Sequence, residues 1–88
     1  MTNSRNEAWL RSVLERISGQ RANHIPLVAD LEDAIGLDSL GRLEVLSEIE
    51  DKFDFFFDDQ ALTTARTIEG MLKEIDRHTA HEGKEPAE

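Results

Sequence analysis

Residues 36–53 are GLDSLGRLEVLSEIEDKF, and this stretch decides the fold. Its apolar side chains recur every three or four positions, which is the spacing that places them on one face of a helix. The helix is predicted to run from Ser39 to Phe53. Its predicted inward stripe consists of Leu40, Leu43, Leu46, Ile49 and Phe53. Asp38 can cap the helix by accepting a hydrogen bond from a backbone N–H of the first turn, which leaves Ser39 pointing outward.

The hydroxyl of Ser39 is predicted to lie where a long loop meets the positive end of the helix dipole. Free backbone N–H groups at that end favour a phosphate bound to or near the hydroxyl. A hydrolase is disfavoured, because a nucleophile elbow needs Gly where Leu37 stands and no positioned His base accompanies the serine. The residues alone indicate either an exposed phosphorylation-type acceptor or an ordinary helix cap.

Acidic residues gather around this serine. Glu44, Glu48 and Asp51 are spaced so that their carboxylates share one outward face of the helix. The chain has 88 residues, 19 acidic and 10 basic, and a net charge of −9. Residues 30–59 hold 11 of the acidic and 2 of the basic residues, which leaves a balance of −9 in that segment. This charge disfavours nucleic-acid binding and favours basic protein surfaces as partners.

Two further helices are predicted. The first covers Ser4 to Ile17, and Gly19 ends it because glycine enters the left-handed conformation without a steric cost. The last begins at Thr67 and fades near Arg77. No alternation typical of strands is visible, so the predicted fold class is all-α.

The connections complete the predicted architecture. A long first loop covers residues 20–38, in which residues 27–34 allow a short helical turn, and another short turn covers residues 58–62. The expected fold is a small four-helix bundle of three longer helices and one short helix. Residues 1–77 would form the domain. Residues 78–88 would form a disordered acidic tail, because they contain no large apolar residue.

Composition excludes several classes of protein. The chain has no Cys, so it has no disulfide framework and no thiolate zinc site. No apolar run approaches the roughly 20 residues that span a bilayer, and the default expectation is a cytoplasmic protein without membrane insertion. His78 and His81 lack further well-placed ligands, so no metal site is predicted, and His24 is expected to be structural.

The motif Gly36-Leu37-Asp38-Ser39-Leu40, with Leu43-Glu44 after it and a short terminal helix near Thr67-Ile68, resembles the acyl carrier protein family. In that family the serine of an Asp-Ser-Leu motif is esterified by a phosphopantetheine arm. The resemblance covers Trp9 to Ile75. It implies that Ser39 carries 4′-phosphopantetheine from coenzyme A, with Asp38 beside the attachment point and Leu40 contacting partner enzymes.

The resemblance implies a function as well. The protein would catalyse nothing; it would be a free-standing monomer that holds acyl intermediates as thioesters in fatty-acid, polyketide or related acyl or aminoacyl pathways. Its partners would be a phosphopantetheinyl transferase and acyl-processing enzymes with basic docking surfaces. The residues expected to recognise them are Glu44, Glu48, Glu50 and Asp51. The residues expected to line an acyl cavity are Leu43, Leu46, Ile49, Phe53, Met71 and Leu72.

An alternative from another class is a non-catalytic acidic helical adaptor that binds a basic partner without a prosthetic group. Ser39 discriminates between the two functions, because an adaptor should bind normally as Ser39→Ala whereas a carrier would lose all cargo transfer.

Two features depart from the family pattern. Phe55, Phe56 and Phe57 precede an Asp-Asp pair where the family usually has Pro before an acidic residue, and three consecutive aromatic residues cannot all face one small core. Phe55 or Phe56 either docks a partner, shapes the acyl cavity or packs as an ordinary loop residue. Arg42 would pair with the phosphodiester, with Asp38, or with a neighbouring Glu in an exposed ion pair.

Overall fold

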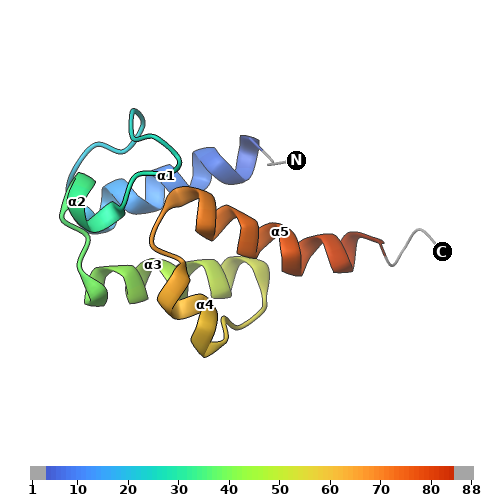
Figure 1. Cartoon of the computed structure of the whole chain (residues 1–88). Coiled ribbons are helices and arrows are strands. Elements are labelled where there is room, and N and C mark those ends of the chain that lie inside the picture. Colours follow the sequence, from blue (N-terminus) through green and yellow to red (C-terminus); the bar gives the residue numbers. More distant parts are fainter. Residues whose placement is uncertain (1–3, 85–88) are drawn as a thin grey trace.

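The computed structural model describes residues 4–84, and within that range the chain is all-helical without strands. The helices are α1 (Ser4–Ser18), α2 (Leu31–Ile35), α3 (Ser39–Phe53), α4 (Asp59–Thr64) and α5 (Ile68–Lys84). The three longer helices contact one another pairwise, while α2 and α4 are short helices in the connections between them (Figure 1). The predicted all-α bundle is therefore confirmed, with two short helices in place of one.

One hydrophobic core joins the helices. Each long helix contributes apolar side chains to it, and the short helices α2 and α4 contribute to it as well. Its largest fully buried side chains are Leu10, Leu14, Leu31, Leu46, Ile49, Ile68, Met71, Leu72 and Ile75. No helix within residues 4–84 is both long enough and apolar enough to cross a membrane.

The predicted inward stripe of α3 is partly wrong. Leu46 and Ile49 are buried as expected, but Leu40 and Leu43 are 68% and 48% exposed. Steps of three residues each rotate about 60° short of a full turn, so Leu40 lies roughly 120° around the helix from Leu46. The face toward the core instead takes Val45, which is fully buried.

The predicted end of the last helix is also wrong. α5 continues past Arg77 to Lys84, so residues 78–84 are helical and not a disordered tail. The His78 ring stacks on Phe55 with centroids 4.0 Å apart, and the Thr79 hydroxyl donates to the Ile75 carbonyl at 2.7 Å. His78 thus packs against the α3–α4 connection just past the predicted end of the helix. The remainder of the predicted tail, residues 85–88, lies outside the described residues.

The long first loop is held by polar contacts from other elements. Arg11 of α1 donates to the carbonyls of Ala22 and Ile25 at 2.6 and 2.9 Å. The Glu69 N–H at the start of α5 donates to the Leu27 carbonyl at 2.9 Å. These bonds satisfy backbone carbonyls of the loop that have no partner within a helix, and they tether the loop to α1 and α5.

Candidate functional site

The entry into α3 is fixed by one glycine and one buried leucine. Gly36 ends α2 in the left-handed conformation, with φ at 70°, and its N–H donates to the Glu32 carbonyl at 2.9 Å. Leu37 follows with 2% exposure. A Cβ on Gly41 would lie 2.9 Å from Leu37 Cδ1, so glycine at that position lets the leucine pack under the first turn of α3.

Asp38 is the N-cap of α3, as predicted. Its backbone is extended, with φ at −79° and ψ at −174°, and its Oδ1 accepts from the Gly41 N–H at 2.9 Å. Its carbonyl accepts the first helical bond, from the Arg42 N–H at 2.8 Å. The Asp38 carboxylate therefore caps the first turn of α3, and the next residue, Ser39, is the first residue of the helix.

Ser39 meets the requirements of a phosphate ester site. Its side chain is exposed, and in the described part of the chain its hydroxyl makes no hydrogen bond. The negative charge of a phosphodiester there would face the positive end of a helix of 15 residues. The residues present thus fit the phosphopantetheine group that the sequence motif implies.

Exposed apolar side chains flank this hydroxyl. Leu40 and Leu43 lie one and four positions after Ser39 on α3 and are largely in solvent. The exposed Glu44 follows. Leu40 is thus accessible from solvent, and Leu43, which was expected to line an acyl cavity, is 48% exposed in the structure.

Four of the other five proposed cavity residues lie inside, and Phe53 lies at the edge of the core. Leu46, Ile49, Met71 and Leu72 belong to one core cluster between α3 and α5. Phe53 is half-buried at the end of α3, with its ring in an edge-on contact with Trp9 at 5.6 Å.

The four acidic residues predicted to recognise partners divide into two pairs. Glu44 and Asp51 are exposed. Glu48 forms an ion pair with Arg16 of α1 at 3.2 Å. Glu50 accepts the Phe57 N–H at 2.9 Å, so its carboxylate is bound to the loop that follows α3.

Arg42 makes a different contact from those predicted. Its Nη2 donates to the Leu62 carbonyl of α4 at 3.5 Å, and its Nε is buried without a partner among the described residues. Within residues 4–84 it forms no ion pair with Asp38 or a glutamate. The side chain bridges α3 and α4 close to the site.

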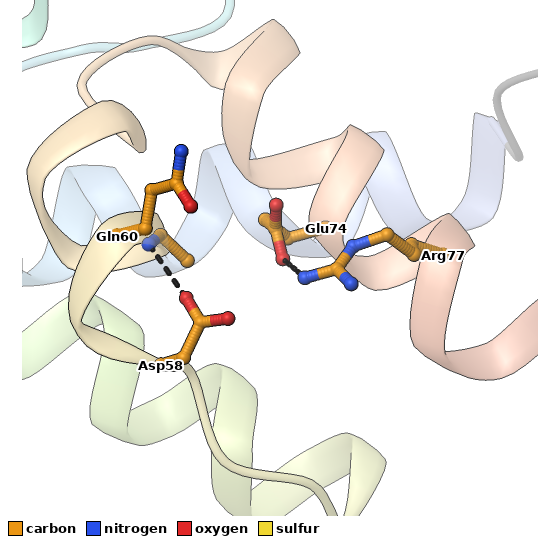
Figure 2. Close-up of a pocket in the computed structure, with 5 residues that line it drawn as sticks. Asp58, Gln60, Glu74 and Arg77 are labelled. Atoms are coloured by element: carbon orange, nitrogen blue, oxygen red, sulfur yellow. Dashed lines mark hydrogen bonds and ion pairs between the residues drawn. The ribbon is translucent and has the colours of Figure 1, made fainter.

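A polar pocket of about 280 Å³ lies between the start of α4 and the middle of α5 (Figure 2). Its lining residues are Asp58, Gln60, Ala61, Glu74 and Arg77. Glu74 accepts a 2.7 Å hydrogen bond from Arg77, which raises the pKa of that guanidinium. The pocket contains none of the predicted site residues, and its charged walls do not suit an acyl chain.

The histidines form no recognised metal centre. Among the side chains that the structure describes, no group of three or more His, Asp or Glu residues is placed to hold an ion. His78 packs its ring on Phe55, and the side chain of His81 lies outside the described residues.

Sequence reasoning also missed the structural role of Gly41 at the site. The signal for that role was a glycine in the first turn of an otherwise regular helix.

Comparison with known proteins agrees with this geometry. Residues 8–75 match the sequence family described as phosphopantetheine attachment site. Acyl carrier proteins of Trieres chinensis and Phaeodactylum tricornutum are each 28% identical to this chain; the matches cover 81% and 83% of the chain and 89% and 96% of those proteins. The non-reducing polyketide synthase trt4 of Aspergillus terreus is 39% identical over 82% of the chain, but that match covers only 3% of the synthase.

Proposed function

Because this chain belongs to the acyl carrier protein family, whose members carry phosphopantetheine and are not themselves catalysts, we propose that Ser39 is the attachment residue. The observation that carries this assignment is the exposed, unbonded hydroxyl directly after the Asp38 cap. Leu40 and the exposed carboxylates of Glu44 and Asp51 are the residues we assign to partner recognition.

The roles of the chain's own residues follow from their positions. Asp38 holds the first turn closed, so that the Ser39 oxygen is presented to solvent at a fixed point. The helix dipole stabilises the negative charge of the phosphate ester. The phosphopantetheine arm, when bound, supplies a terminal thiol that holds an acyl group as a thioester.

We assign the cargo to acyl intermediates of fatty-acid, polyketide or related acyl or aminoacyl pathways. Both kinds of relative support a carrier role, since some are called acyl carrier protein and others are segments of polyketide synthases. Its enzymes would be a phosphopantetheinyl transferase and acyl-processing enzymes with basic docking surfaces, to which the carrier binds as a monomer in the cytoplasm. An adaptor without a prosthetic group is disfavoured by the family match.

The proposal is tested by intact-protein mass spectrometry after incubation with coenzyme A and a phosphopantetheinyl transferase. Wild type should gain the mass of one phosphopantetheine. Ser39→Ala should gain none while keeping the circular dichroism of wild type, because the side chain is exposed.

Ser47→Ala is the matched control, since Ser47 is an exposed serine on the same helix. It should be modified like wild type. Wild-type protein that stays unmodified, or modification that persists in Ser39→Ala, would contradict the assignment.

A further inference from the structure

The connection between α3 and α4 presents one aromatic ring to solvent. Phe56 is 84% exposed, while Phe57 is only 7% exposed and Phe55 is half-buried. Burial of a Phe side chain away from water is stabilising, so the exposed Phe56 ring gains little of that stabilisation in the isolated protein.

The backbone on both sides of Phe56 is anchored. The Phe57 N–H donates to the Glu50 carboxylate at 2.9 Å. The Phe55 ring contacts two others: it stacks on His78, with centroids 4.0 Å apart and planes at 7°, and meets Phe57 at 5.0 Å and 66°. The exposed ring therefore projects from a held segment and not from a loose loop.

The two ends of the connection are held as well. Asp54 caps the end of α3 in the left-handed conformation, with φ at 60°, and its N–H donates to the Glu50 carbonyl at 2.8 Å. Asp58 caps the start of α4 by accepting from the Ala61 N–H at 2.8 Å. A ring on a segment held at both ends loses little conformational freedom when it is buried by a partner, so a larger share of its burial energy becomes affinity.

The chemistry around the ring indicates its partner. Asp54, Asp58 and Asp59 are exposed and lie within three positions of Phe56. The exposed Asp51 is in the last turn of α3. An apolar pocket bordered by Lys and Arg would complement this ring and these carboxylates, whereas an anionic membrane surface would be repelled by them.

The position of the ring suits an enzyme that acts at Ser39. α3 has 15 residues. At about 1.5 Å per residue, the end of α3, three residues before Phe56, lies roughly 20 Å from Ser39. A standard interface buries about 800 Å² per partner, a patch roughly 30 Å across, so one enzyme whose contact patch spans both ends of α3 has the width to contact Ser39 and Phe56 together.

We propose that Phe56 is an aromatic docking anchor for the phosphopantetheinyl transferase that modifies Ser39, and that it enters an apolar pocket with a basic rim on that enzyme. This inference rests on the proposed function. It adds a contact at the opposite end of α3 from the attachment residue.

The test is steady-state kinetics of the source organism's phosphopantetheinyl transferase with this protein as the varied substrate. Phe56→Ser should raise KM about tenfold or more with kcat nearly unchanged, because a contact that binds ground and transition states equally affects KM. Val28→Ser is the matched control: Val28 is 68% exposed but lies in the first loop, and its loss should leave KM unchanged.

Circular dichroism should show both variants folded, since both side chains are largely in solvent. Equal KM values for Phe56→Ser, Val28→Ser and wild type would overturn the inference while leaving the proposed function intact. A wild-type protein that is never modified would refute the proposed function instead. Sedimentation that shows wild-type dimers and Phe56→Ser monomers would assign the ring to a second copy of the chain and would also overturn the inference.

Discussion

At the start of α3, the conformation of one glycine determines how the chain turns toward Ser39. Gly36 has φ at 70°, and a Cβ built there would meet no atom within 4 Å. The requirement for glycine is therefore conformational and not steric. An L side chain in the left-handed region costs about 1–2 kcal/mol, and Asn tolerates that region better than Ala.

We therefore expect Gly36→Ala to lower the free energy of unfolding by about 1–2 kcal/mol, and Gly36→Asn to lower it by less. Urea denaturation followed by circular dichroism measures both changes. Equal stabilities for wild type and Gly36→Ala would contradict the left-handed turn before α3.

Arg42 provides a second prediction at the scale of one residue. Its hydrogen bond to the Leu62 carbonyl is long, at 3.5 Å, and its Nε is buried without a described partner. Methionine keeps most of the aliphatic stem and removes the unsatisfied donor. Arg42→Met should therefore change the free energy of unfolding by less than about 1 kcal/mol.

The same variant tests whether Arg42 acts on the phosphodiester. Because its guanidinium bonds to α4, we expect Arg42→Met to be phosphopantetheinylated at the wild-type rate. A fall in that rate without a change in folding would assign Arg42 to the attachment site.

The contacts of some residues could be predicted from the sequence, and those of others could not. The Asp38 cap and the outward Ser39 follow from local backbone chemistry and are confirmed. Glu50 and Arg42 have partners that lie seven and 20 positions away along the chain. Helical spacing says nothing of such partners, so the internal role of Glu50 and the contact of Arg42 with α4 could not be predicted.

At the scale of elements, the short helix α2 depends on its cap. Asp30 accepts from the N–H groups of Glu32 and Asp33 at 2.9 and 3.3 Å, and its carboxylate pairs with Arg66 at 3.2 Å. Partial desolvation raises the pKa of Asp30, but these hydrogen bonds and the Arg66 charge outweigh it and hold the pKa below its ordinary value of 3.8. Ionised Asp30 therefore ties α2 to the chain that precedes α5.

The sign of the pH dependence follows. Because the pKa of Asp30 is lowered in the folded state, its ionised form stabilises the fold. This contribution to the free energy of unfolding is fully present above pH 3.8 and is lost as the pH falls through the lowered pKa. Asn keeps the capping oxygen but does not titrate. The midpoint of urea denaturation should therefore decrease less between about pH 6 and about pH 3 in Asp30→Asn than in wild type. Equal falls would contradict the prediction.

Elements were predictable where local signals mark both ends. α3 runs from Ser39 to Phe53 as predicted, because a cap precedes it and a regular apolar pattern fills it. The end of α5 was not predictable, since the helix continues past Arg77 and its His78 ring stacks on Phe55, a contact between residues far apart in the sequence. The exposure of Leu40 and Leu43 was not predicted, because side chains spaced three residues apart do not stay on one face but shift progressively around the helix.

At the scale of the whole molecule, the negative charge is concentrated in one segment. The balance of −9 within residues 30–59 includes the exposed Glu44, Asp51, Asp54, Asp58 and Asp59. Such a surface attracts a basic enzyme over distances that salt shortens, since the Debye length is about 10 Å at 0.1 M and about 3 Å at 1 M.

We accordingly expect the KM of the phosphopantetheinyl transferase for this protein to rise steadily with NaCl concentration. The double variant Glu44→Gln with Asp51→Asn should have a higher KM at low salt and a weaker salt dependence than wild type. A KM that is independent of salt in wild type would contradict electrostatic recognition by this segment.

The attachment of phosphopantetheine to Ser39 is the central claim, and peptide mapping tests it most directly. Trypsin cleaves after Arg21 and Arg42, and the peptide between them, residues 22–42, contains Ser39 as its only hydroxyl residue. After treatment with coenzyme A and a phosphopantetheinyl transferase, that peptide should carry the whole mass increase of the protein. An increase found on any other peptide, or on none, would contradict the claim.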